Sequence, residues 1–214
     1  ISFDPPLDVF VFQKANKAQS RAAALAALAF RDQQTYPRVS RATNRAQRQA
    51  IQPYQQLRYW STVAFRHGTA DIVKFAASPA AHNPVAALDR RSPNALADEL
   101  KRHLDEDAVM STFDFGVQLL DIENMTYRGR HQDASFWIEN AAIEWPEVMA
   151  PFHTVARLTL VPGSVFCAAA AEATYFDVNQ HALPEHAPVG AVNRARAYAE
   201  AASHKARMQH RDLH

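Results

Sequence analysis

Arginine, tyrosine and glutamate recur at helical spacing between residues 188 and 207, and they form two polar stripes. One stripe is Arg194, Tyr198 and Lys205, and the other is Arg196, Glu200 and Arg207. Residues two apart on a helix point about 200° from each other, so the two stripes cannot serve one ligand together. From spacing alone, the simplest chemistry is ion pairing on a solvated helix. A pair such as Arg196 with Glu200 stabilises a helix by only about 0.2–0.5 kcal/mol.

The helix that carries these stripes follows a proline-marked turn at Pro188 and is rich in alanine, a strong helix former. Asn193 is the expected N-cap, because its side chain can accept from the free N–H groups of the first turn. Alanines recur on one face, which predicts close packing against a flat or dense surface. These alanines are Ala195, Ala199, Ala202 and Ala206.

The rest of the chain alternates between strand and helix patterns. Residues 14–31 read as a helix, and residues 32–56 as an irregular, arginine-rich arm. Ser92 as N-cap and Pro93 at the first position open an amphipathic helix through Asp105, and residues 165–173 form another. Alternation or extended aromatic patterns predict strands at 9–12, 59–68, 70–75, 113–120 and 155–160. Strands first and helices last predict an α+β fold with an antiparallel sheet.

Composition limits the partners and the compartment. The chain has 214 residues, enough for one domain, and a formal net charge of +1 with both signs interspersed. Such a balance predicts no nucleic-acid partner and no anionic membrane surface. No apolar run reaches the roughly 18 residues that span a bilayer, so we expect a soluble chain. The single cysteine, Cys167, favours a reducing compartment, and we expect cytoplasmic localisation.

Other candidate sites receive little support from their spacing. His181 and His186 lack cysteine or paired acidic neighbours at metal-ligand distance, and Cys167 lacks a basic neighbour that would lower its pKa. No serine lies in a nucleophile elbow, and no glycine-rich phosphate loop is present. An arginine cluster in the arm is a solvated face or a partner-binding segment. This cluster is Arg38, Arg41, Arg45 and Arg48.

Four blocks, taken in order, resemble the catalase-related family of heme-dependent hydroperoxidases, and most closely its short, srp-type branch. The blocks are YWSTVAFRHG with VKF (59–68 and 73–75), EWPE (144–147), VARLTL (155–160), and HALPEH with PVGAVNRAR (181–186 and 188–196). The resemblance covers about residues 57–207. It implies an antiparallel β-barrel with flanking and C-terminal helices, of which this chain holds the C-terminal half. One domain over 1–214 would then comprise a helix and arm (1–56), barrel strands and helices (57–187) and a heme-proximal helix (188–210).

The family's proximal pattern is Arg-x-x-x-Tyr with a second arginine seven residues beyond the tyrosine. The resemblance implies that this tyrosine binds ferric iron, that the first arginine lowers its pKa, and that the second pairs with a heme propionate. Aligned without a gap, Arg196 and Arg207 fall on the two arginine positions and Glu200 falls on the tyrosine. A shift of two residues instead places Arg194 and Tyr198 in Arg-x-x-x-Tyr spacing. Tyr198 is therefore the expected iron ligand, with Glu200 as the alternative.

The resemblance implies a heme-dependent oxidoreductase that breaks down hydrogen peroxide or organic hydroperoxides with a small organic reductant. Arg194, Arg196 and Arg207 would bind or tune the heme. The family's distal histidine lies upstream of the blocks found here, so we expect a missing N-terminal part, a homo-oligomer or a second chain that completes the barrel. The alternative is a heme-free structural or interaction subunit that kept the fold, in which Glu200 marks the lost ligand.

Overall fold

The structure is a computed structural model that describes residues 51–84, 87–89, 91–141, 143–163, 170 and 174–211. The predicted strand at 9–12, the helix at 14–31, most of the arm, the arginine cluster, Cys167 and most of the helix at 165–173 lie outside these residues. The described part begins near the short 3-10 helix η1 (Tyr54–Gln56).

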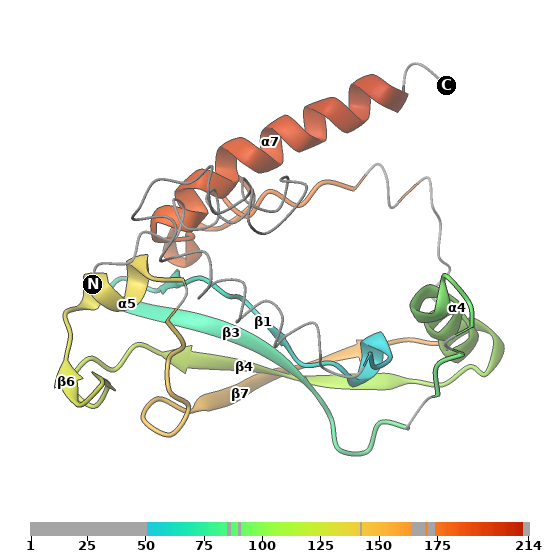
Figure 1. Cartoon of the computed structure of the whole chain (residues 1–214), viewed down its shortest axis with the longest axis horizontal. Helices are drawn as coiled ribbons and strands as arrows, with labels where there is room; N and C mark the ends of the chain where they lie inside the picture. The colour runs from blue at the N-terminus through green and yellow to red at the C-terminus, as the bar shows by residue number, and fades with distance from the viewer. Residues whose placement is uncertain are drawn as a thin grey trace, which may run out of the picture.

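One antiparallel sheet forms the centre of the described fold (Figure 1). Its strands are β1 (Tyr59–Trp60), β2 (Phe65–His67), β3 (Asp71–Pro79), β4 (Ser111–Leu119) and β7 (Phe152–Leu160). The order is β1-β3-β4-β7, and β2 also pairs with β3. A two-stranded sheet joins β5 (Thr126–Tyr127) to β6 (Arg130–His131). The strands predicted at 70–75, 113–120 and 155–160, with their antiparallel pairing, are confirmed. The extended segment predicted at 59–68 forms two short strands, β1 and β2.

The register places alternate side chains of β3 on opposite faces. Phe75 contacts Phe65 at 5.2 Å and Phe115 at 5.5 Å between ring centroids, which makes one face aromatic. Lys74 pairs with Gln118 in the β3–β4 register, on the opposite face. The class is mixed, with helices and antiparallel sheets, but the described residues form an open sheet and no closed barrel. The predicted barrel is therefore corrected to an open sheet, because β7 pairs with β4 along one edge only.

The helices lie at the ends of the sheet. They are α4 (Ala95–Lys101), which continues as the π-helix η2 (Arg102–Glu106), α5 (Ala134–Glu139), the 3-10 helix η3 (Pro184–His186) and α7 (Ala191–Arg211). The prediction that Ser92 caps α4 is wrong, because the N-cap residue is Asn94. Ser92 instead bonds the Asp98 carboxylate through its hydroxyl at 2.6 Å, one turn into the helix.

A small core joins α5 and the loop before β7 to the sheet. Its buried members are Ala64, Met125, Trp137, Trp145 and Ala150. The Trp145 indole N–H donates to the Trp137 carbonyl at 3.2 Å, which satisfies a polar group that would otherwise be costly to bury. No helix among the described residues has the length and apolar character to cross a bilayer.

Candidate functional site

Helix α7 starts at Ala191, before the expected N-cap Asn193, and a side chain from α5 caps it. Glu139 accepts the Ala191 N–H at 2.6 Å, which places a carboxylate at the positive end of the helix. The same carboxylate pairs with the Arg194 guanidinium at 3.0 Å. Gly190, with φ of +90°, makes the turn into the helix. The first turn of α7 is therefore fixed against α5.

Asn193 lies inside α7, so the prediction that it is the N-cap is wrong. Its side chain is buried, with 1% of its surface exposed. The amide group donates to the carbonyls of Ala64 and Val189, both at 2.9 Å. Asn193 thus docks the helix onto the chain beside β2 instead of satisfying the helix start.

The face of α7 that the rest of the molecule covers is not the alanine face. Beyond Ala191 and Val192 at the start of the helix, its buried or half-buried residues are Asn193, Arg196, Ala197, Glu200 and His204. The four predicted packing alanines are all exposed among the described residues. That prediction is therefore wrong: the buried amide of Asn193 sets the rotation of the helix, and the alanine stripe lies outside the contact.

A hollow of about 360 Å³ lies beside the middle of α7. The segment that begins at residue 174 runs back alongside the helix (Figure 1), and residues 174–176 form the other wall of the hollow. The lining residues are Thr174, Tyr175, Phe176, Ala199, Glu200, Ser203 and Arg207. Two members of the second polar stripe, Glu200 and Arg207, therefore face one space.

Arg196, the third member of that stripe, holds the Glu200 carboxylate. Its Nε and Nη2 atoms contact Oε1 of Glu200 at 2.8 and 2.7 Å. The ion pair predicted from spacing is confirmed. Glu200 Oε2 is buried and has no hydrogen-bond partner among the described residues. A buried carboxylate oxygen without a partner is costly, so this atom marks a place for a donor or a cation.

Tyr175 supplies an aromatic wall to the hollow, and the sequence reasoning missed it. Its ring stacks on His204 at 4.1 Å with an interplanar angle of 9°. Its hydroxyl donates to the Asp177 carboxylate at 2.8 Å, and this hydrogen bond raises the pKa of Tyr175 and lowers the pKa of Asp177. Nearby Glu200 also raises the pKa of Tyr175, whereas Arg207 lowers it.

Tyr198 lies away from the hollow. Its side chain is 81% exposed, and it does not line the space that Glu200 and Arg207 face. Arg194, one turn earlier, is bound to Glu139, and Lys205 is exposed. The structure thus separates the two stripes. Glu200 and Arg207 line the hollow and Arg196 is paired with Glu200, whereas Arg194, Tyr198 and Lys205 do not line it.

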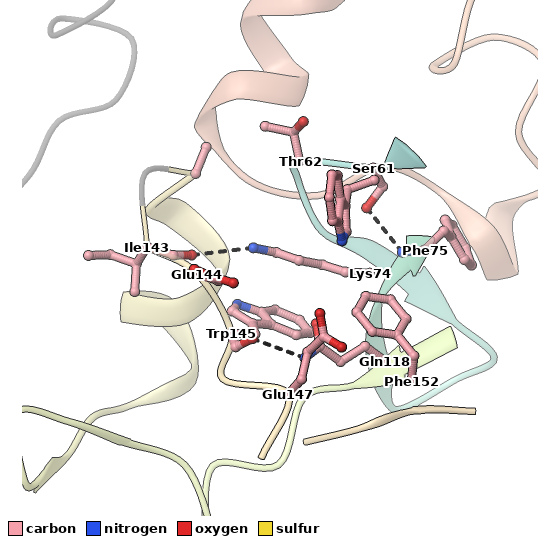
Figure 2. A pocket seen from close by; sticks show the side chains of 12 residues that line it. Ser61, Thr62, Lys74, Phe75, Gln118, Ile143, Glu144, Trp145, Glu147 and Phe152 are labelled. Carbon is pink, nitrogen blue, oxygen red and sulfur yellow. Dashed lines mark hydrogen bonds between the residues drawn. The ribbon is translucent and has the colours of Figure 1, made fainter. Parts of the chain in front are cut away.

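A second cavity, of about 330 Å³, lies on the Lys74 face of the sheet (Figure 2). Aromatic and aliphatic side chains make up most of its wall. These are Trp60, Ala141, Ile143, Trp145 and Phe152. Lys74 lies at its base with 9% of its surface exposed, and its Nζ is 4.8 Å from the centroid of the Trp145 ring.

The polar contacts of the Lys74 ammonium compensate poorly for its removal from water. Among the described residues its ammonium donates one hydrogen bond, to the Ile143 carbonyl at a long 3.4 Å. Desolvation lowers the pKa of Lys74 to about 8, against a smaller opposing effect of Glu144. The sequence carried one signal of this site, a single lysine between Val73 and Phe75, but alternation alone assigns such a residue to a solvated face.

No cluster of three or more histidine, cysteine, aspartate or glutamate side chains that could hold a metal ion occurs in the described part of the chain. His181 lies beside the Asp177 N–H at 3.4 Å, and the rings of His67 and His186 lie 5.3 Å apart. His181 and His186 thus make local contacts in the segment before α7, and His67 contacts His186 from strand β2.

Comparison with known proteins supports the fold alone. No protein-family model matches the chain, and no curated protein sequence matches it. Among solved structures, a fungal catalase crystal structure aligns with a TM-score of 0.55 at 13% sequence identity. The alignment covers 72% of this chain and 32% of the catalase, so the chain spans about a third of that protein's length. The described fold is therefore catalase-like in architecture.

Proposed function

We propose that this chain supplies the proximal side of the heme pocket in a heme-dependent oxidoreductase that breaks down hydrogen peroxide or organic hydroperoxides. The observation that carries the proposal is the hollow beside α7, where the gapless register of the catalase-related pattern places its residues. Arg196, Glu200 and Arg207 form one stripe, and the last two line the hollow with Tyr175. The likeness of the described fold to a fungal catalase supports the proposal at the level of the fold.

The residues at the hollow fit a ferric heme through oxygen and arginine contacts. Glu200 offers a carboxylate whose Oε2 has no hydrogen-bond partner among the described residues. Arg196 holds the other oxygen in an ion pair at 2.7 Å, in the position where the family's pattern has its first arginine. Arg207 lines the same hollow and would supply a guanidinium group for a propionate. Tyr198 fits this role poorly, because it is 81% exposed on the other stripe.

Each side chain then has a defined task. Glu200 would ligate the iron, Arg196 would orient the carboxylate, and Arg207 would anchor the porphyrin edge, with Tyr175 and Phe176 as apolar walls. When bound, the heme supplies the redox chemistry that cleaves the peroxide O–O bond. We assign no residue of this chain to proton transfer on the opposite side. A small organic reductant would complete the turnover.

The second candidate function is a heme-free subunit that kept the fold. It is favoured by the Arg196–Glu200 ion pair, which already neutralises the carboxylate at 2.7 Å. In that case the hollow is a structural cleft, and Glu200 replaces a lost ligand. The two functions make opposite predictions for heme titration.

The first experiment is a titration of the purified chain with ferric heme, followed by absorption spectroscopy. The wild-type chain is expected to bind one heme with a Soret band. Glu200→Gln is expected to weaken binding about tenfold or more, because it removes the anionic donor. Tyr198→Phe, the matched control on the other stripe, is expected to leave the spectrum unchanged.

A gain-of-function variant tests the position independently. Glu200→Tyr restores the family's ligand type, and its heme complex is expected to show a high-spin ferric spectrum with a phenolate-to-iron charge-transfer band. Loss of the Soret band in Tyr198→Phe, with Glu200→Gln unaffected, would reassign the ligand to Tyr198. A folded wild-type chain that binds no stoichiometric heme would establish the heme-free function.

A further inference from the structure

The cavity around Lys74 is separate from the hollow at α7 and plays no part in the proposed heme site. It combines a buried primary amine with apolar walls. The loop that forms one wall is held to the sheet by Gln118, whose amide group donates to the carbonyls of Trp145 at 3.1 Å and Ala150 at 2.6 Å. The other wall is tied to β3 through Ser61, whose hydroxyl accepts the Phe75 N–H at 3.1 Å. The cavity is therefore a fixed feature of the fold.

The Lys74 side chain extends across the floor of the cavity. Figure 2 shows it crossing above the Trp145 ring toward Ile143 and Glu144. Trp60, which lines the cavity, is 57% exposed, so this wall of the cavity reaches the surface. A small molecule can thus reach the amine along aromatic walls. The long contact of Nζ to the Ile143 carbonyl, 3.4 Å, leaves the amine weakly held.

The charged groups around Lys74 leave its amine without a tight ion pair. Glu144 lines the cavity, but no ion pair links it to Lys74 among the described contacts. Glu147, on the same loop, forms an ion pair with Arg58 at 2.9 Å. Gln118, opposite Lys74 in the sheet register, is neutral. An amine in apolar surroundings without an ion-paired carboxylate loses its proton more readily than a solvated one.

We propose that Lys74 is a reactive amine that captures small apolar aldehydes as an imine within this cavity. Trp60, Trp145 and Phe152 would bury the hydrocarbon part of the aldehyde, and Lys74 Nζ would meet its carbonyl carbon. The occupant is an aldehyde because an imine needs a carbonyl group, and the walls favour an alkyl or aryl chain.

The step balances without any further reactant. The lone pair of the neutral amine forms a bond to the carbonyl carbon, and the carbonyl oxygen takes up a proton. The nitrogen of the resulting carbinolamine then loses its second proton, and the oxygen leaves as water. Both amine protons are thus accounted for in the water, and a C=N bond remains. No oxidant or reductant takes part. Lysines in desolvated pockets are activated for this chemistry because more of the amine is neutral.

The fraction of neutral amine gives the expected size of the effect. Desolvation lowers the pKa of Lys74 from 10.5 to about 8. Near neutral pH this raises its neutral fraction roughly a hundredfold or more over an exposed lysine. A lower pKa also reduces intrinsic nucleophilicity, so we expect Lys74 to react at least about tenfold faster than an exposed lysine.

The test is reductive trapping on the whole chain. The protein is incubated with hexanal and cyanoborohydride near neutral pH, so that hydride addition to the imine carbon gives a stable secondary amine. Peptide mass mapping then compares the rate at Lys74 with the rates at Lys101 and Lys205, which are both exposed. Faster modification of Lys74 than of both exposed lysines supports the proposal.

Two controls keep the result specific. Lys74→Arg retains a cation near Trp145 but has no primary amine, so the fast modification is expected to disappear. In wild-type protein unfolded by urea, the preference for Lys74 is expected to be lost, because the cavity is lost. Equal rates at the three lysines in the folded protein, or a Lys74 that stays unmodified, would overturn the proposal and leave Lys74 as a cation–π contact.

Discussion

At the scale of single residues, the molecule's most unusual group is a lysine in an apolar cavity. Lys74 has one long hydrogen bond among the described residues and an aromatic ring beneath its ammonium. Its burial costs free energy because a charged amine is better solvated by water than by these partners. The poor solvation of the Lys74 ammonium makes the amine reactive, and it also makes the charged form of the side chain destabilising.

The poor solvation of the buried ammonium predicts that the stability of the protein depends on pH. The pKa of Lys74 is about 8 in the folded state and near 10.5 when solvated. Between these values the unfolded state binds one more proton than the folded state, so the Lys74 contribution to stability rises with pH. Below pH 8 the burial penalty is fully present. Lys74→Met is therefore expected to be more stable than wild type at neutral pH, on the order of 1–3 kcal/mol.

The measurement is urea unfolding of both proteins over a pH series from neutral to strongly alkaline. The advantage of Lys74→Met is expected to shrink as the pH rises through and beyond the folded pKa of about 8. Lys101→Met, at an exposed position, is the control and is expected to change little. A constant difference between Lys74→Met and wild type across the series would show that the ammonium is well solvated.

At the scale of elements, the contact between α5 and the start of α7 positions the helix that carries the candidate heme site. Gly190 makes this contact possible, because it has φ of +90° and no side chain. A Cβ at this position would lie 2.7 Å from the Ile138 carbonyl oxygen. The capping of α7 by Glu139 depends on the same close approach.

Gly190→Ala is expected to destabilise the protein by about 2–4 kcal/mol, since the change adds steric strain to the cost of a positive φ. Gly129, with φ of +75° and open space around it, is the matched control. Gly129→Ala is expected to lose only about 1 kcal/mol. Chemical denaturation of the two variants measures the difference. Equal losses would mean that α5 can move away from α7 without cost.

At the scale of the whole molecule, a few buried polar groups attach α7 to the sheet. Asn193 is the main one, since it satisfies the carbonyl of Ala64, a residue 129 positions earlier in the chain. At the opposite side of the sheet, β7 pairs with β4, and every residue from His153 to Thr159 is exposed. An open strand edge is a ready site for pairing with another strand. A homo-oligomer, or a second chain that pairs with β7, therefore stays a prediction.

Asn193→Ala is expected to loosen the whole of α7. The change removes the buried side-chain hydrogen bonds to the carbonyls of Ala64 and Val189, and it is expected to cost about 1–3 kcal/mol. Arg194→Ala is the matched control one residue on, because it removes a solvent-exposed pair with Glu139 worth about 0–1 kcal/mol. Hydrogen exchange measures both. Faster exchange along α7 is expected in Asn193→Ala, and unchanged protection would show that other contacts hold the helix.

Local patterns in the sequence predicted much of the described fold. Alternation at residues 113–120 and 155–160 corresponds to β4 and β7, and the glycine turn at Gly68 separates β2 from β3. The spacing of Arg196 and Glu200 predicted their ion pair. The helix starts were less predictable. Both Ser92 and Asn193 have good capping chemistry, but packing decided where each helix begins.

The amino-acid sequence by itself determined the strands, the long C-terminal helix and the two polar stripes, because these follow from periodicities of two and 3.6 residues within short segments. Only the tertiary structure decided which of the two polar stripes of α7 lines the hollow beside the helix. The rotation of α7 depends on Asn193 reaching Ala64, a contact across most of the described chain. The exposure of the alanine face and the burial of Lys74 have the same origin: local spacing sets which residues share a face, and long-range packing decides which face is covered.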